Sequence, residues 1–289
     1  MYVITGITGQ VGGEVARTLL AAQLPVRAVV RDAAKGIAWA EQGCDIAYAE
    51  MHDAGALAAA FRGAQAVFIL LPPSFDPAPG FPESTGRVAA IYTALAAARP
   101  KRVVCLSTIG AQAREPNLLN ALQIMEHKLR QLPMPVAFLR AGWFMENLMW
   151  DIAVAQATGV VPSFLQPLDK PVPMVATADV GRTAAALLQE AWQGVRIVEL
   201  EGPQRITPNQ IAQVMSAVFN RPVSMSAVPR DSWEDLFRSQ GMKHPLPRIR
   251  MLDGFNEGWI EFEGPDEQVR KGEVEMSAVL QALTQKMAT

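Results

Sequence analysis

The chain has 289 residues, half of them hydrophobic, and a formal net charge of −2 at pH 7. This length can bury one large core, or one core with a smaller lobe beside it. Lysine and arginine are scattered along the chain, so we expect no nucleic-acid partner. No stretch reaches the roughly 18 to 20 apolar residues of a membrane span, and the apolar run at the start predicts a strand rather than a signal peptide. We therefore expect a cytoplasmic protein without membrane association.

The two cysteines, Cys44 and Cys105, lie in apolar runs with neither CxxC spacing nor a histidine pair nearby. Both are expected to be buried thiols in a reducing cytosol rather than a disulfide or metal ligands. His52 and His244 also stand alone in the sequence. The chain therefore predicts no metal site.

Short apolar strands alternate with helices over the first 140 residues. This alternation predicts an α/β fold built on a doubly wound parallel sheet with helices on both faces. Such a sheet places its ligand loops at the carboxyl ends of the strands. The expected strands are 3–5, 26–30, 45–49, 66–71, 102–107 and 136–140, and the expected helices are 15–22, 33–42, 54–62, 84–98 and 117–131.

After residue 140 the alternation becomes less regular, and proline-rich loops separate the elements. These residues predict a smaller α+β substrate lobe, 141–289, partly interwoven with the first domain, 1–140. Its expected elements are helices near 178–191, 208–219 and 274–286, a strand at 196–200, and a helix that begins within 226–235.

Three glycines, Gly6, Gly9 and Gly12, follow the first strand directly and open the first helix. A turn without side chains lets backbone N–H groups approach a pyrophosphate, whose charge the positive helix end stabilises. The spacing is GxxGxxG rather than GxGxxG, and such glycines can also serve only to pack the helix onto the sheet. Because further strand-helix units follow, the context favours a Rossmann-type site for a nicotinamide dinucleotide.

The end of the second strand bears on the choice between NADP(H) and NAD(H). Arg31 lies there, with Lys35 one helical turn further on, and this pair suits the 2′-phosphate of NADP(H). Asp32 could instead accept a hydrogen bond from the ribose hydroxyl of NAD(H), and Arg31 could be only a solvated charge. The sequence favours NADP(H) and leaves NAD(H) open.

Further motifs follow the glycine turn in order along nearly the whole chain. These motifs are GITGQVGG (6–13), VVRD (29–32), AEMHD (49–53), FILLPP (68–73), LSTIGA (106–111), Glu126, LRAGWFMEN (139–147), TADVGRTAAALL (177–188) and EGPQRITPNQIA (201–212). Together they resemble the NmrA-like branch of the atypical short-chain dehydrogenase/reductases, which includes NADPH-dependent quinone, triphenylmethane-dye and azo-dye reductases. AEMHD stands where that family usually has Gly-Asp-x-x-Asp.

The resemblance implies a set of cofactor contacts. Beyond the three glycines, they are Thr8, Gln10 and Val11 at the pyrophosphate, Arg31 and Lys35 at the 2′-phosphate, Glu50 and Met51 at the adenine, Leu70, Leu71 and Pro72 beneath the ribose or pyrophosphate, Ser107 and Thr108 near the nicotinamide ribose, and Gly142, Trp143 and Phe144 over the nicotinamide. Leu70 and Leu71 are expected to act through their backbone. Trp143 and Phe144 could equally be core residues between the lobes.

The Tyr-x-x-x-Lys pair of the short-chain dehydrogenases is missing, so no catalytic residue is assigned. Counting back from Glu126 puts its two places at Leu119 and Gln123, which cannot donate a proton in that way. His127 and Lys128 are the nearest titratable groups and are expected to be solvated on a helix face. Ser107 has no histidine and carboxylate at the spacing of a hydrolase triad.

A missing proton donor is tolerable for a small, planar, electron-poor aromatic acceptor, whose reduced form is resonance-stabilised and can take a proton from water. Trp143, Phe144, Met145, Met149, Trp150 and Phe164 are available to stack on such a ring, and the same residues could be core. We therefore expect an NADPH-dependent reductase of quinones or of azo or triarylmethane dyes. The alternatives are a redox sensor that binds NADP(H) without turnover and, less favoured, an epimerase. The sequence is also compatible with a homodimer.

Overall fold

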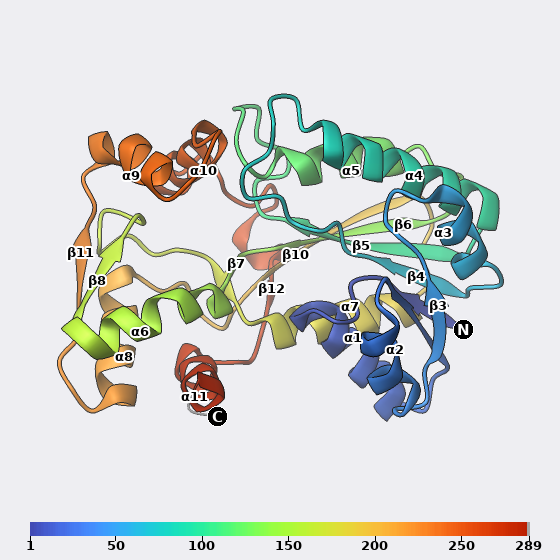
Figure 1. Cartoon of the computed structure of the whole chain (residues 1–289), viewed down its shortest axis with the longest axis horizontal. Helices are drawn as coiled ribbons and strands as arrows, with labels where there is room; N and C mark the ends of the chain where they lie inside the picture. The colour runs from blue at the N-terminus through green and yellow to red at the C-terminus, as the bar shows by residue number, and fades with distance from the viewer. Residues whose placement is uncertain (288–289) are drawn as a thin grey trace.

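The computed structural model describes residues 1–287 and has a parallel eight-stranded sheet at its centre (Figure 1). The strand order is β12-β10-β6-β5-β4-β1-β2-β3. Successive strands are added on one side of β1 up to β3 and on its other side from β4 onward, so the order switches between β1 and β4. In doubly wound sheets, ligands bind outside the carboxyl ends of the strands at this switch. The sheet comprises β1 (Tyr2–Ile4), β2 (Val26–Val30), β3 (Asp45–Tyr48), β4 (Ala66–Ile69), β5 (Arg102–Thr108), β6 (Val136–Ala141), β10 (Val195–Glu201) and β12 (Arg270–Lys271).

Helices cover both faces of the sheet, as predicted (Figure 1). Alternate residues of each strand point to opposite faces, so Val104 and Leu106 of β5 join one core while Val103 and Cys105 join the other. Cys44 and Cys105 are buried free thiols, as expected. One face carries α1 (Gln10–Ala21), α2 (Ala33–Ala40) and α7 (Thr177–Gln189), and the other carries α3 (Ala54–Phe61), α4 (Pro82–Ala98) and α5 (Asn120–Leu129).

A second core, centred on the fully buried Trp233 and Phe237, forms the smaller lobe at the left of Figure 1. Two short two-stranded parallel sheets, β8-β11 and β7-β9, belong to it. Its elements are β7 (Trp143–Phe144), η1 (Met145–Leu148), α6 (Met149–Thr158), β8 (Val160–Ser163), β9 (Met174–Val175), α8 (Pro208–Phe219), β11 (Ser224–Ala227), η2 (Arg230–Ser232), α9 (Trp233–Ser239), α10 (Leu246–Glu257), η3 (Asp266–Gln268) and α11 (Met276–Met287).

The two parts of the molecule interweave, because α7 and β10 leave the smaller lobe and return to the large sheet. β10 pairs with β6 from Val195 opposite Val136 to Leu200 opposite Ala141. α7 lies against α1 so closely that a Cβ at Gly181 would come within 2.4 Å of the Cβ of Glu14. The strand expected at 196–200 is therefore an interior strand of the main sheet rather than part of a separate lobe.

The helix expected to begin within 226–235 does so, because α9 starts at Trp233, after β11 and the extended Pro229. One expectation about the elements needs correction. The helix expected from 117 begins at Asn120, because the side chain of Asn117 accepts from the N–H of Leu119 and holds a turn there. α6 and α10 were not expected.

The segment 261–275 crosses the carboxyl edge of the sheet and is held there by buried carboxylates. Glu199 accepts from the backbone N–H groups of Glu263 and Gly264 at 2.8 and 2.9 Å. Asp179 of α7 accepts from those of Glu273 and Val274 at 3.1 and 2.9 Å. The C-terminal part of the chain is thus fixed to the main sheet. Within residues 1–287, no helix is long and apolar enough to cross a membrane.

Candidate cofactor and acceptor site

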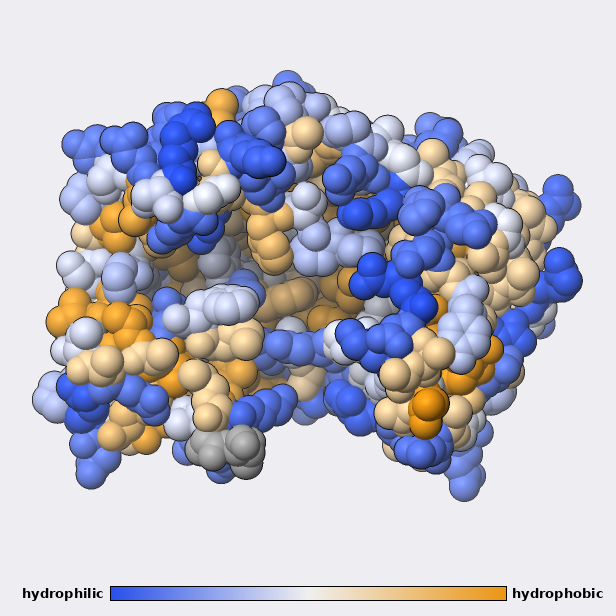
Figure 2. Space-filling model, in the orientation of Figure 1, coloured by the Kyte–Doolittle hydropathy of each residue, from blue (hydrophilic) through white to orange (hydrophobic). Residues whose placement is uncertain are grey.

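A hollow runs between the main sheet and the smaller lobe (Figure 2). The loops that leave the carboxyl ends of β1, β4, β5 and β6 lead to this side of the molecule, where β7 begins directly after β6 (Figure 1). Apolar and polar residues both line the visible part of the hollow (Figure 2). Its position at the strand ends is where an open α/β sheet binds its ligands.

The glycine turn at one end of this edge requires glycine at two of its three positions. Gly6 has φ of +64°, a conformation that other residues adopt with strain. A Cβ at Gly12 would lie 2.3 Å from the carbonyl oxygen of Gly6, so only glycine lets α1 start this close to the turn. Gly9 is the N-cap of α1, and its own Cβ would meet only that oxygen, at 3.3 Å. The open place in the turn is therefore at Gly9.

Residues around the turn separate into exposed and packed groups. Thr8, Gly9 and Gln10 are exposed, whereas Val11 is 3% exposed and points into the core. The N–H of Val11, rather than its side chain, is thus available at the helix start.

Leu70, in the loop after β4, lies directly against Gly6, with side-chain atoms 3.1 to 3.3 Å from the position of a Cβ there. The hydroxyl of Thr5 accepts from the N–H of Leu70 at 2.9 Å and donates to the carbonyl of Phe68 at 3.0 Å, which fixes this loop. Leu71 is buried and Pro72 is half-buried. Contacts from Leu71 to a bound molecule would therefore come from its backbone.

Arg31, directly after β2, and Glu50 form a solvent-exposed ion pair. The Arg31 guanidinium, 71% exposed, lies 4.0 Å from the Glu50 carboxylate, which is 50% exposed. Lys35 is exposed in the first turn of α2, and Met51 is buried. Asp32 accepts from the N–H of Ala34 at 2.8 Å and so caps α2. Its carboxylate is engaged at the helix end, which leaves Arg31 and Lys35 as the exposed cations near the end of β2.

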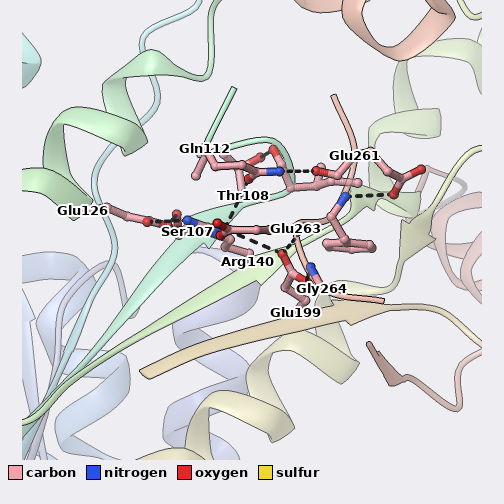
Figure 3. Close-up of polar contacts among 12 residues, drawn as sticks. Ser107, Thr108, Gln112, Glu126, Arg140, Glu199, Glu261, Glu263 and Gly264 are labelled. Atoms are coloured by element: carbon pink, nitrogen blue, oxygen red, sulfur yellow. Dashed lines mark hydrogen bonds and ion pairs between the residues drawn. The ribbon is translucent and has the colours of Figure 1, made fainter. Parts of the chain in front are cut away.

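Ser107 lies near the carboxyl end of β5, in a buried polar network (Figure 3). Its hydroxyl donates to Glu126 of α5 at 2.6 Å, and Glu126 is 2% exposed. Thr108 is buried as well and donates to the carbonyl of Ile109 at 3.1 Å. The Ser107 hydroxyl is thus occupied by Glu126, and contact with a nicotinamide ribose would fall to Thr108 or to the backbone.

Arg140, at the end of β6, is the centre of this network and is 2% exposed. It donates from Nε and Nη2 to the two oxygens of Glu126 at 2.9 and 2.8 Å, and from Nη1 to Glu263 at 2.7 Å (Figure 3). Glu199 lies 3.7 Å from Nη1. Burial alone would raise the pKa of Glu126, but the hydrogen bonds and charge of Arg140 outweigh it and lower that pKa. Both groups are therefore charged and structural.

Gly142, Trp143 and Phe144 connect the sheet to the smaller lobe. Gly142 has a packing role, since a Cβ there would lie 2.6 Å from the carbonyl oxygen of Pro173. The Trp143 ring packs edge-on against Phe255 of α10, with centroids 5.1 Å apart. Both Trp143 and Phe144 stay half-buried beside a core, so each combines a packing contact with an accessible surface.

The other apolar residues expected in the pocket have different positions. Met145 is 2% exposed in the smaller core, and Phe164 packs on Trp233 and Phe237. Met149 and Trp150, at the start of α6, are 38% and 78% exposed. Trp143 and Phe144 remain the aromatic residues best placed at the end of β6.

No proton donor occupies the two places of the missing tyrosine and lysine. The Gln123 amide donates to the carbonyls of Ala111 and Ala113 at 3.0 and 2.8 Å, and Leu119 packs on the smaller core. His127 is exposed, as expected, and Lys128 lies over the Tyr92 ring at 4.3 Å. Within the part of the chain that the structure describes, no group of histidine, cysteine or carboxylate side chains could hold a metal ion.

Two contacts between distant segments of the chain were not predicted from the sequence. Asp76, in the loop after β4, accepts from the N–H groups of Lys243 and His244 at 2.8 and 2.7 Å and so joins the sheet to the smaller lobe. Glu146 of η1 accepts from the backbone N–H of Thr177 at the start of α7. A charged residue within an apolar strand, as in VAFLRA, could have indicated the Arg140 pair, but no local signal marks the partners of Asp76 or Glu146.

The fold and the glycine turn define a Rossmann-type α/β protein with a second lobe over the carboxyl ends of its strands. Residues 2–257 match the model of the NmrA-like family, and the chain belongs to that family, as the resemblance predicted.

The chain is also similar to one named relative and to two solved structures. The chain is 29% identical to the NAD(P)H azoreductase of Xenophilus azovorans over 248 residues, 85% of this chain and 83% of that protein. The Escherichia coli NADPH-dependent quinone oxidoreductase QOR2, solved with NADPH, superposes with a TM-score of 0.81 at 22% identity over 99% of this chain and all of that one. The Citrobacter sp. triphenylmethane reductase, solved with NADP(H), gives 0.80 at 21% identity over 97% and 99% of the two chains.

Proposed function

We propose that the protein is an NADPH-dependent reductase that transfers a hydride to a small, planar, electron-poor acceptor such as a quinone or an azo or triarylmethane dye. The cofactor would lie along the carboxyl ends of the strands, with its pyrophosphate at Gly9 and its nicotinamide near Trp143. The acceptor would occupy the hollow between the sheet and the smaller lobe (Figure 2). The named activities of the azoreductase and the quinone and triphenylmethane reductases support this assignment.

The observation that carries the proposal is the chemistry at Leu119 and Gln123. A ketone needs a proton on oxygen as the hydride arrives, and neither residue can supply it. A triarylmethane cation becomes neutral when it takes a hydride and needs no proton. A quinone gives a resonance-stabilised anion that water protonates. Acceptors of this kind need mainly positioning and exclusion of water from the nicotinamide.

NADP(H) is favoured over NAD(H) because Arg31 and Lys35 are exposed cations near the end of β2 while Asp32 caps α2. A carboxylate directed to a helix end is less available to a ribose hydroxyl. We propose that Arg31 makes the main contact with the 2′-phosphate and that Glu50 lies beside it.

The test is consumption of NADPH and, in parallel, NADH with menadione, a cationic triarylmethane dye and an azo dye. We expect steady turnover with NADPH. Gly9→Asp is the matched control, because its Cβ makes a single close contact, 3.3 Å from the Gly6 oxygen, and its carboxylate lies where the pyrophosphate should bind. A folded Gly9→Asp protein with unchanged cofactor affinity would contradict the placement of the site.

A redox sensor that binds NADP(H) without turnover is the second candidate, and it is favoured by the same two residues, Leu119 and Gln123. Tight binding of NADPH with no consumption across the three acceptors would support the sensor and exclude the reductase.

We also propose a cytoplasmic location, where NADPH is abundant and the buried thiols Cys44 and Cys105 stay reduced. The mixed charge of the surface gives no reason to expect a nucleic-acid partner. A homodimer is the assembly to test, by light scattering of the purified protein.

A further inference from the structure

Three polar side chains link the smaller lobe to the glycine turn. Both oxygens of Glu146 accept from the N–H of Thr177, at 2.9 and 3.0 Å. Oε1 of Glu146 also lies 2.7 Å from the hydroxyl of Thr177, and that hydroxyl lies 3.2 Å from Oε1 of Gln10. Gln10 is the first residue of α1 and is exposed beside Gly9. This chain of hydrogen-bonded side chains therefore runs from η1, through the start of α7, to Gln10 beside Gly9 in the glycine turn.

The single hydroxyl proton of Thr177 allows only two arrangements of this chain. An ionised Glu146 takes that proton, so Thr177 can only accept from Gln10, which must turn its NH2 group inward and its carbonyl oxygen outward. A protonated Glu146 donates to Thr177, which then donates to the Gln10 oxygen, and the NH2 group faces outward. The inward position of the Gln10 oxygen matches the second arrangement, whereas the 2.7 Å contact between the Thr177 hydroxyl and Glu146 fits either one.

The surroundings of Glu146 shift its pKa upward. Burial raises its pKa above the usual range, against the opposing effects of the Thr177 hydrogen bonds and of the Lys286 charge from α11. On α1 and α7 the neighbouring acidic groups are already paired, Glu14 with Arg17 and Asp179 with Arg182. On α6, burial raises the pKa of Asp151 to about 6, so this neighbour also loses its charge in mild acid.

We propose that Glu146 is a positioning residue for the cofactor, which acts through Thr177 to make Gln10 present its NH2 group, and not its carbonyl oxygen, to the pyrophosphate. The inference rests on the proposed dinucleotide site at Gly9. Pyrophosphate oxygens only accept hydrogen bonds, so they bind the outward NH2 group and repel an outward carbonyl. Cofactor binding is consequently coupled to proton uptake at Glu146, two residues beyond Phe144 at the nicotinamide end.

The experiment measures dinucleotide affinity between about pH 5 and 8 for the wild type, Glu146→Gln and Thr177→Val. NADH is titrated beside NADPH, because the 2′-phosphate of NADPH itself titrates near pH 6. We expect the wild-type affinity for NADH to fall about tenfold as pH rises, the equivalent of losing one hydrogen bond to a charged group. Glu146→Gln should bind as the wild type does in acid at every pH, because its amide donates to Thr177 as the protonated carboxyl does.

Thr177→Val separates the hydrogen-bond chain from simple charge repulsion. It keeps the N–H group that Glu146 accepts from and removes only the hydroxyl, so affinity should be weaker and independent of pH. If this variant keeps the wild-type pH dependence, or if wild-type NADH affinity is flat, the inference is wrong.

Calorimetry in two buffers of different ionisation enthalpy gives a second measurement that does not depend on the folding of Glu146→Gln. Wild-type protein should take up a fraction of a proton on binding NADH near neutral pH, and Thr177→Val should take up none. Absence of dinucleotide binding to the wild type at any pH would instead contradict the proposed function.

Discussion

Arg31 and Asp32 are neighbours in the sequence but face different partners, and in the proposed site this difference decides the cofactor. Arg31→Ala should weaken NADPH and leave NADH nearly unchanged. Because the guanidinium is 71% exposed, screening by solvent limits the effect to about tenfold, or roughly 1.4 kcal/mol. A fluorescence titration with both reduced cofactors measures it.

Two variants serve as controls for this prediction. Lys35→Ala should act in the same direction but less, since a flexible ammonium loses more entropy on pairing. Glu50→Gln should tighten NADPH slightly, because the carboxylate 4.0 Å from Arg31 competes with the phosphate. Equal weakening of both cofactors by Arg31→Ala would show that Arg31 does not contact the 2′-phosphate.

Glu126 is the second residue with a strong expected effect, this time on stability. Glu126→Gln leaves the buried Arg140 without its two-point partner and should reduce the free energy of unfolding by about 3 kcal/mol, the lower end for a broken buried pair because Glu263 and Glu199 remain. Ser107→Ala, which removes one hydrogen bond to the same carboxylate, should reduce it by about 1 kcal/mol. Denaturant unfolding of the three proteins gives both values.

The same pair predicts a pH dependence. The folded-state pKa of Glu126 is lowered, so its contribution is complete above the unfolded-state pKa of about 4.3 and is lost as pH falls through the folded-state value. The stability difference between wild type and Glu126→Gln should therefore be constant near neutrality and shrink in acid. A difference that grows in acid would contradict this sign.

Single residues could be predicted from the sequence where the reason is local. Gly6 and Gly12 were identified because a turn between a strand and a helix demands them. The role of Ser107 could not be predicted, since its hydroxyl partner, Glu126, lies on a different element. Asp76 and Glu146 were missed for the same reason, because Asp76 contacts residues 167 and 168 positions away.

At the scale of elements, Asp76 joins the loop after β4 to the segment just before α10. The carboxylate accepts from two successive N–H groups, which lowers its pKa. Asp76→Ala should increase hydrogen exchange at the amides of Lys243 and His244 and leave the global stability almost unchanged, because the group is at the surface. Mass spectrometry of peptides spanning 243–250 provides the measurement.

The control for this prediction is Glu83→Ala, which removes a surface ion pair with Arg87 on the nearby α4. It should leave the exchange of residues 243–250 as in the wild type. Unchanged exchange in Asp76→Ala would mean that other contacts hold the loop.

The elements that were predicted from the sequence pack on segments close to them in the sequence, whereas those that were missed pack on segments far from them. Each βα unit of the sheet is continuous in sequence, so its apolar period was readable. β8 is short, contains Pro162 and pairs with β11 more than 60 residues later, from Val160 opposite Ser224. α10 begins among prolines and carries two arginines, and its apolar face is defined only by packing on Trp143 and the smaller core.

At the scale of the whole molecule, the interweaving predicts that the two lobes unfold together. β10 completes the sheet beside β6, α7 covers it, and Glu199 and Asp179 fix the segment 261–275. Hydrogen exchange in increasing denaturant should expose β1–β5 and α9–α10 at the same midpoint. Two separated midpoints would show that the smaller lobe is an independent unit.

The path of α7 and β10 also limits how such a protein can change during evolution. Exchange of a gene segment encoding everything after β6 would remove an interior strand and a covering helix of the cofactor-binding sheet along with the acceptor-binding lobe. New acceptors are therefore more accessible through substitutions and loop insertions within η1, α6, α9 and α10 than through recombination of whole domains. In this architecture, catalytic diversity would accumulate gradually, on a lobe that is inherited together with the sheet.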